Sequence, residues 1–324
     1  MIEVNSVIQN NVIKLFTGEK LFECGEVESP LIEGFLWPRD VIMLLGSEKA
    51  GKSILAMQMA SCLTSGEKFL DIYDCQRTPV LYIQTEGKRE EFARRLKNIN
   101  NSIPVFNDDF YHVYKKQLPI DNAEFNHELK KIIAQLPKVP KVMFIDSLYS
   151  SMEGDLNDNK ATRKFIGMVA QLTEARHMAV VIIHHEKKEN FNSSLGESVK
   201  HDGDKGAYGS IFLRAWVDHI IFLRMNRDKT RTLSCSTQRS GTIEMNHDLV
   251  LVEPDPLCFQ IKGDYAACTE IVKGALKING QMLKEDIIKK TGLSLSSIDK
   301  ALRQLKKDKL VDYSSSYPRE FYII

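Results

Sequence analysis

The stretch that decides the fold is the eight-residue segment Gly46-Ser47-Glu48-Lys49-Ala50-Gly51-Lys52-Ser53. A strand-like apolar run (residues 41–45) precedes it, and a helix-like run (residues 54–60) follows it. A strand that turns through glycines into a helix directs several backbone N–H groups at one point, at the positive end of the helix dipole. The pattern G-x-x-x-x-G-K-S therefore predicts a phosphate-binding loop for a nucleoside triphosphate. Lys52 reaches the β- and γ-phosphates in such a loop, the Ser53 hydroxyl ligates Mg²⁺, and Ile54 completes the binding segment.

The composition of the 324 residues narrows the class of protein further. No apolar run approaches the roughly 20 residues needed to cross a bilayer, and the N-terminus has no basic or apolar signal region. The six cysteines are scattered without C-x-x-C spacing, which is typical of reduced thiols and argues against a zinc site or a disulfide framework. We therefore expect a cytoplasmic protein without membrane contact. The net charge of +1 means that any binding to nucleic acid must come from local basic patches.

Five short apolar runs alternate with helical patterns along most of the chain. They cover residues 41–45, 80–84, 142–145, 179–183 and 218–223. Apolar runs of this kind are typical of parallel strands that are buried on both faces, so we expect an α/β fold with a mostly parallel central sheet. The expected organisation is a leader (residues 1–37), an NTPase domain (38–255), a linker (256–264) and a small C-terminal unit (265–324).

Two carboxylates follow predicted strands, and each is a candidate for the chemistry of the site. Asp146 ends the run of residues 142–145, as in a Walker B strand, where a carboxylate holds Mg²⁺; a simple turn residue is the alternative. Glu86 follows the run of residues 80–84 and would face the same crevice. The residues alone leave two interpretations of Glu86 open: the group that activates the attacking water, or a residue that favours a helix N-terminus.

The adjacent residues His184 and His185 follow the run of residues 179–183. Neighbouring residues of a strand point to opposite faces, and no cysteine or carboxylate follows at metal-ligand spacing. A histidine that senses the γ-phosphate is therefore favoured over a metal site.

The order of these elements resembles the RecA/DnaB superfamily, and in particular the RepA-type hexameric helicases of plasmids and phages. The lead-in of residues 30–38 and the segment of residues 206–218 also resemble that family, and the resemblance covers residues 25–255. It implies a RecA-like fold, ATP as the substrate, Glu86 as the catalytic carboxylate and either His184 or His185 as the sensor. It also implies a ring, expected to be a hexamer, around single-stranded DNA. The polar segment of residues 186–209 would then line the channel, where four lysines meet DNA phosphates: Lys187, Lys188, Lys200 and Lys205.

In that superfamily the ATP site lies between subunits, and a basic residue of the neighbouring subunit touches the γ-phosphate. Arg239 is the first candidate for this role, with Arg227 and Lys229 as alternatives. A solvated charge at a strand end is an equally good interpretation of Arg239 from the sequence. The loop interior Ser47-Glu48-Lys49-Ala50 departs from the Gly- and Pro-rich residues usual in that family, and Glu48 brings a negative charge close to the phosphates.

The C-terminal unit has the pattern of a winged helix, with three helices followed by two strands joined by a short turn. Its third predicted helix carries Lys300, Arg303 and Lys307 on a shared face, which would enter a major groove of duplex DNA. A surface for protein contacts is the alternative, because the excess of basic residues in the unit is small.

Two functions from different classes fit these features. The first is an ATP-dependent DNA helicase or translocase that acts on single-stranded DNA in replication. The second is an ATP-switched DNA-binding regulator or helicase loader that uses the winged helix on duplex DNA. A strand-exchange recombinase fits less well, because the segment before the phosphate-binding loop is short.

Overall fold

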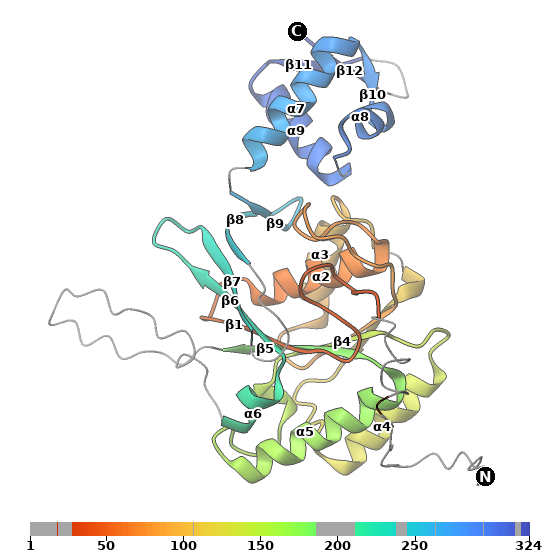
Figure 1. Cartoon of the computed structure of the whole chain (residues 1–324), viewed down its shortest axis with the longest axis vertical. Helices are drawn as coiled ribbons and strands as arrows, with labels where there is room; N and C mark the ends of the chain where they lie inside the picture. Colours follow the sequence, from red (N-terminus) through yellow and green to blue (C-terminus); the bar gives the residue numbers. More distant parts are fainter. Residues whose placement is uncertain are drawn as a thin grey trace, which may run out of the picture.

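A nine-stranded sheet forms the centre of the large domain in the computed structural model (Figure 1). The structure describes Gly18 and residues 28–105, 107–185, 211–237, 245–262, 264–293, 295–314 and 319–324. The strand order is β3-β2-β4-β5-β1-β6-β7-β8-β9. The strands are β1 (Val41–Gly46), β2 (Val80–Gln84), β3 (Phe110–Tyr114), β4 (Val142–Asp146), β5 (Ala179–His185), β6 (His219–Met225), β7 (Arg231–Thr237), β8 (Asn246–Val252) and β9 (Cys258–Ile261).

The sheet is parallel from β3 to β6 and antiparallel from β6 to β9. The expected α/β fold with a mostly parallel central sheet is therefore confirmed. All five predicted strands are present, as β1, β2, β4, β5 and β6. The sequence did not predict β3 or the antiparallel strands. The segment 258–261, expected in the linker, is instead β9, because Cys258 and Phe259 bury their side chains in the large domain.

Helices cover both faces of the sheet (Figure 1). One face carries α2 (Lys52–Ser65) and α3 (Arg89–Asn100). The other carries α4 (Ala123–Gln135), α5 (Asn159–Thr173) and α6 (Ile211–Trp216). Successive residues of a strand point to opposite faces, so β1 supplies both cores: Ile42 and Leu44 pack with α2, whereas Met43 and Leu45 pack on the other side.

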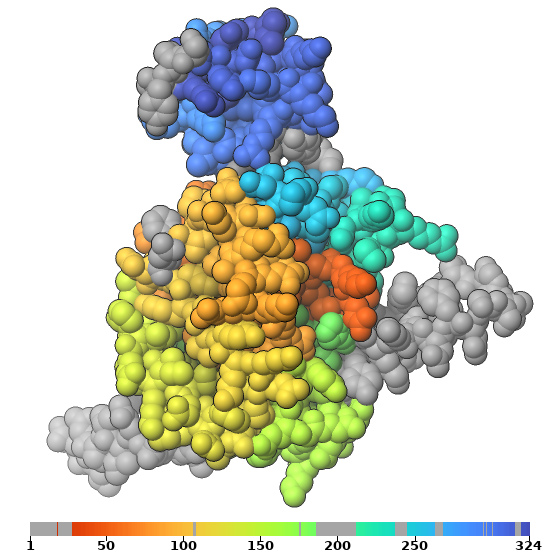
Figure 2. Space-filling model, turned by 180° about the vertical axis from the view of Figure 1, so that it is seen from behind, coloured from red at the N-terminus to blue at the C-terminus, as the bar shows by residue number. Residues whose placement is uncertain are grey.

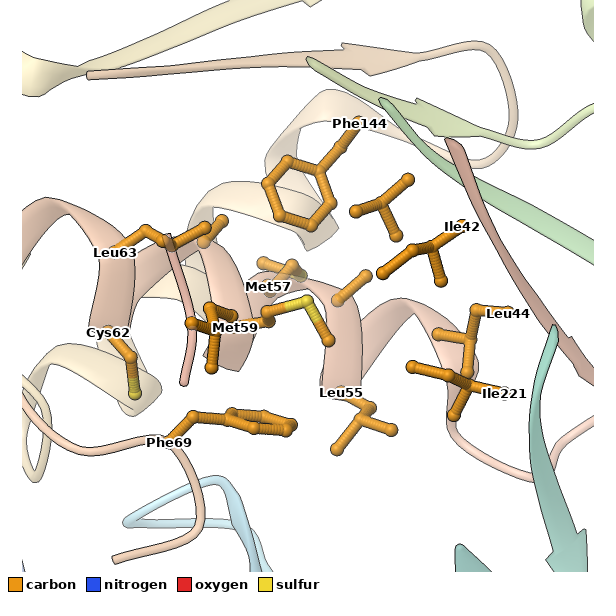
Figure 3. Close-up of a cluster of buried hydrophobic side chains, with 14 of the residues drawn as sticks. Ile42, Leu44, Leu55, Met57, Met59, Cys62, Leu63, Phe69, Phe144 and Ile221 are labelled. Atoms are coloured by element: carbon orange, nitrogen blue, oxygen red, sulfur yellow. The ribbon is translucent and has the colours of Figure 1, made fainter. Parts of the chain in front are cut away.

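The contact between α2 and the sheet fixes the helix that follows the phosphate-binding loop. Figure 3 shows Leu55 and Met57 of α2 beside Ile42 and Leu44 of β1, with Phe144 of β4 closing the cluster. All five side chains are fully buried. Burying such a side chain stabilises the fold by about 1.5–3 kcal/mol, so α2 is held firmly on the end of β1. The end of the expected leader joins the same core, because Ile32 and Phe35 are fully buried as well.

The C-terminal unit has a hydrophobic core of its own. It contains α7 (Asp264–Asn279), α8 (Lys284–Thr291), α9 (Leu295–Lys307), β10 (Met282–Leu283), β11 (Val311–Tyr313) and β12 (Glu320–Ile323). The small antiparallel sheet has the order β10-β12-β11. Figure 2 shows the unit as a lobe beside the large domain. The described part of the chain has no helix with the length and apolar character needed to span a membrane.

Candidate nucleotide-binding site

The phosphate-binding loop connects the end of β1 at Gly46 with the start of α2 at Lys52. Gly51 has a φ of 101°, in the left-handed region, and a Cβ atom there would lie 2.7 Å from the ring of Phe259. A Cβ atom on Gly46 would collide with the backbone carbonyl oxygen of Leu223. Both glycines of the motif are therefore required by the backbone of this chain, and β6 and β9 contribute to that requirement.

Lys52 lies inside the loop and is only 6% exposed. Its Nζ donates hydrogen bonds to the carbonyl oxygens of Gly46 and Ser47, both at 2.8 Å, and lies 3.2 Å from Nδ1 of His185. A buried ammonium needs such partners. The arrangement keeps a cation at the point where the loop would receive phosphate oxygens.

Asp146 lies at the end of β4, between β2 and β5. The hydroxyl of Tyr82 donates to its Oδ2 at 2.8 Å, and Ser53 also hydrogen-bonds the carboxylate. Burial raises the pKa of Asp146, while the hydrogen bonds from Tyr82 and Ser53 act in the opposite direction. A buried carboxylate that is costly to ionise is stabilised by a nearby cation, and Mg²⁺ prefers carboxylate and hydroxyl oxygens. Ser53 and Asp146 therefore fit a Mg²⁺ ion that arrives with the nucleotide.

Glu86 follows β2 and is held by two hydroxyl groups from the segment after β4. Ser147 Oγ and Ser150 Oγ both donate to Glu86 Oε1, the latter at 2.8 Å. Thr85 ties the two segments together, since its N–H donates to the carbonyl oxygen of Asp146 at 2.7 Å and its hydroxyl accepts the N–H of Ser147 at 2.9 Å. The Glu86 carboxylate is thus fixed beside Asp146, in the crevice that the sequence predicts.

The two histidines at the end of β5 point to opposite faces of the sheet. In the pairing of β5 with β1, His184 lies opposite Leu45 and His185 lies opposite Gly46. His184 is 2% exposed, whereas His185 is half-buried and faces Lys52. Burial and, to a lesser extent, the charge of Lys52 lower the pKa of His185, so its imidazole is neutral at pH 7. Of the two, it is His185 that the fold brings to the phosphate-binding loop.

A cavity of about 420 Å³ lies over the loop. It is lined by Lys49, Gly51, Lys52, Ser53, Ile54, Glu86, Arg95, Asp146, Ser147, Ile183, His185, Arg231, Leu251 and Glu253. A smaller cavity of about 230 Å³ shares Ser53, Glu86, Arg95 and Asp146 with it. The size of the larger cavity is within the range of small-molecule sites, about 300–1,000 Å³. Glu48, the unusual residue of the motif, is exposed at the tip of the loop.

Sequence reasoning missed several residues of the site, namely Tyr82, Arg95, Ser147, Ser150 and Arg231. The position of Ser147, directly after Asp146, was a usable signal. Tyr82 and Arg231 gave no such signal, because only the pairing of distant strands brings Tyr82 to Asp146 and Arg231 to the loop.

Several predicted residues lie outside the described part of the chain: Arg239, Lys187, Lys188, Lys200 and Lys205. Arg227 and Lys229 are exposed in the turn between β6 and β7. On α9, Arg303 and Lys307 are exposed, and the side chain of Lys300 is not described.

A parallel sheet with a glycine loop at the end of β1, and acidic residues at the ends of β2 and β4, defines a P-loop ATPase. A comparison with protein families agrees, since the model of the AAA domain family matches residues 21–190. That match covers more than half of the chain, which therefore belongs to this family. A search of the curated proteins finds no match.

Proposed function

We propose that this ATPase is a DNA helicase or translocase of the RepA-like hexameric type, which acts on single-stranded DNA in replication. The observation that supports ATP hydrolysis, the part of the proposal that the site itself carries, is the position of Glu86. Its carboxylate is fixed by Ser147 and Ser150 at the edge of the cavity that contains Lys52 and Asp146. A fixed carboxylate at this position suits the activation of a water molecule for attack on the γ-phosphate.

Each residue of the loop has a role in this chemistry. Lys52 exchanges the carbonyl oxygens of Gly46 and Ser47 for phosphate oxygens when ATP enters. Ser53 and Asp146 hold Mg²⁺, which neutralises charge on the phosphates. His185 senses the γ-phosphate, because it is neutral and contacts the same lysine. The movement of Lys52 changes the surroundings of His185, which directly precedes the polar segment of residues 186–209.

In this proposal the site is completed by a neighbouring subunit. Arg239 reaches the γ-phosphate of the next chain and stabilises charge in the transition state. Lys187, Lys188, Lys200 and Lys205 line the channel of the ring and contact DNA phosphates. These assignments rest on the family resemblance of the sequence.

The alternative function, an ATP-switched regulator or helicase loader on duplex DNA, is favoured by one observation. The C-terminal unit has its own core, and its three helices are followed by the paired strands β11 and β12, with the two-residue strand β10 between α7 and α8. Its helix α9 exposes Arg303 and Lys307, two of the basic residues predicted to enter a major groove.

The test is ATP hydrolysis by the full chain with and without single-stranded DNA, together with strand displacement. The helicase proposal predicts that single-stranded DNA stimulates hydrolysis, and that Lys52→Ala and Glu86→Gln abolish both hydrolysis and displacement. Lys160→Ala, which removes an exposed lysine on α5, is the control and should retain both. A rate of hydrolysis that does not change when single-stranded DNA is added, together with no strand displacement, would contradict the proposal. Duplex binding lost in Arg303→Ala/Lys307→Ala would then support the regulator.

A further inference from the structure

Arg231 is a cationic residue that no motif of the sequence explains. It begins β7, and its side chain is half-buried in the wall of the larger cavity. The same cavity contains Lys52, Ser53 and His185. Arg231 therefore lies in the same chain as the phosphate-binding loop that it faces, unlike Arg239, which is expected to serve a neighbouring chain.

Two hydrogen bonds to backbone carbonyl oxygens hold Arg231 in place. Its Nε donates to the carbonyl oxygen of Ala50 at 3.2 Å, and its Nη1 donates to that of Lys229. Ala50 is the residue before Gly51 in the motif, so the guanidinium touches the loop itself. The guanidinium carbon also lies 5.9 Å from the centroid of the Phe259 ring, the ring that packs under Gly51.

The charge of Arg231 has no carboxylate partner within the described part of the chain. Both of its hydrogen bonds go to neutral carbonyl groups, and its ring contact is also to a neutral group. Arg77, by contrast, shares its charge with the carboxylate of Asp109. A half-buried guanidinium without such a partner, in a cavity over a phosphate-binding loop, is suited to an anionic ligand.

We infer that Arg231 is a second cationic ligand of the nucleotide's phosphate chain, supplied by the same subunit as Lys52. The inference rests on the nucleotide site of the proposed function and extends it to a residue outside the motif. The Nε bond to Ala50 fixes the guanidinium beside the loop, and its remaining N–H groups bind phosphate oxygens. Arg231 thereby gives β7, and not only the loop, a direct contact with the nucleotide.

The experiment measures the dissociation constant of the full chain for Mg-ADP and for a Mg-bound non-hydrolysable ATP analogue, without DNA. Arg231→Ala should weaken the binding of both by at least about tenfold, which corresponds to about 1.4 kcal/mol. Arg231→Gln keeps a donor for Ala50 but removes the charge, so it should lose as much as Arg231→Ala. Arg231→Lys should recover part of the affinity.

Arg176→Ala is the matched control. Arg176 is also half-buried and donates to a backbone carbonyl, that of Leu172. It precedes β5, however, and so lies at the amino-terminal ends of the parallel strands, whereas the phosphate-binding loop lies at their carboxyl ends. The Arg176→Ala variant should bind both nucleotides with the affinity of the wild type. Added salt should weaken the wild type more steeply than Arg231→Gln, because one phosphate contact has been removed from the variant.

Unchanged affinity of Arg231→Ala, or wild-type affinity of Arg231→Gln, would overturn the inference and leave Arg231 as a structural tether of Ala50. If Arg231→Ala does not fold, the comparison of Arg231→Gln with Arg231→Lys decides the question. Failure of the helicase proposal is a separate result, because it appears as wild-type chains that bind nucleotide normally but do not respond to DNA.

Discussion

The parallel and antiparallel halves of the central sheet differ in what they give to the site. The candidate catalytic and nucleotide-binding residues lie at or just beyond the carboxyl ends of the parallel strands β1, β2, β4 and β5. No candidate catalytic residue lies at the end of the described antiparallel strands β7 to β9. These strands nevertheless contact the phosphate-binding loop through Arg231 and Phe259. The parallel half therefore carries the candidate catalytic residues, whereas the antiparallel half contacts the loop that would hold the phosphates.

The largest expected effect tests the parallel half. Glu86→Gln removes the base but keeps the size of the side chain and its ability to accept the hydrogen bonds of Ser147 and Ser150. Hydrolysis of ATP should fall by about 10²–10⁴-fold, the usual contribution of a general base, while the affinity for the nucleotide changes little. Steady-state turnover and equilibrium binding on the same preparation check this. Equal losses of turnover and of nucleotide affinity would show that Glu86 serves binding and not catalysis.

The two halves should also differ in how much their side chains stabilise the fold. Ile42 of β1 is fully buried, whereas Val250 of β8 is 39% exposed. Ile42→Ala should lower the free energy of unfolding by about 2–5 kcal/mol. Val250→Ala should change it by no more than about 0.5 kcal/mol. Urea unfolding followed by circular dichroism measures the free energy of unfolding of both variants. Similar losses in the two variants would show that the two halves do not differ in this respect.

The contact between the loop and β9 can be tested by substituting its two residues together. Gly51→Ala places a side chain at a positive φ and against the ring of Phe259. The variant should lose about 1–3 kcal/mol of stability from the backbone conformation alone. Phe259→Leu in the same chain should return part of the remaining loss, with a coupling of about 0.5–3 kcal/mol. Strictly additive effects in this double-mutant cycle would show that β9 does not constrain the loop.

The smallest expected effect is the pH dependence that His185 contributes. The fold lowers the pKa of His185 below its unfolded value of about 6.5. At a pH between the folded and unfolded pKa values, His185 therefore binds more protons in the unfolded chain than in the folded chain. This contribution to stability is therefore present above about pH 6.5 and is lost as the pH falls through the folded pKa. His185→Gln should flatten the decline that begins as the pH falls below about 6.5. Equal slopes for wild type and His185→Gln would exclude the effect.

The parallel half could be predicted from the sequence because its strands are buried on both faces. Their apolar runs and the polar residues that end them are local signals, and Glu86 and Asp146 follow directly from them. The antiparallel strands are only partly buried, and β8 shows exposed and half-buried residues along its length. Its apolar run, residues 249–252, is short, and only Leu249 of that run is fully buried. The same holds for the site, since strand pairings that a local pattern does not encode bring Arg231 to the loop and Tyr82 to Asp146.

The most direct test of the central claim is the rate of ATP hydrolysis per chain, measured over a range of protein concentrations with and without single-stranded DNA. If the site is completed by a neighbouring subunit on DNA, the rate per chain rises with concentration and rises further with DNA. Arg239→Ala should abolish the rise without weakening the binding of nucleotide. A rate that is independent of concentration and of DNA would contradict the account.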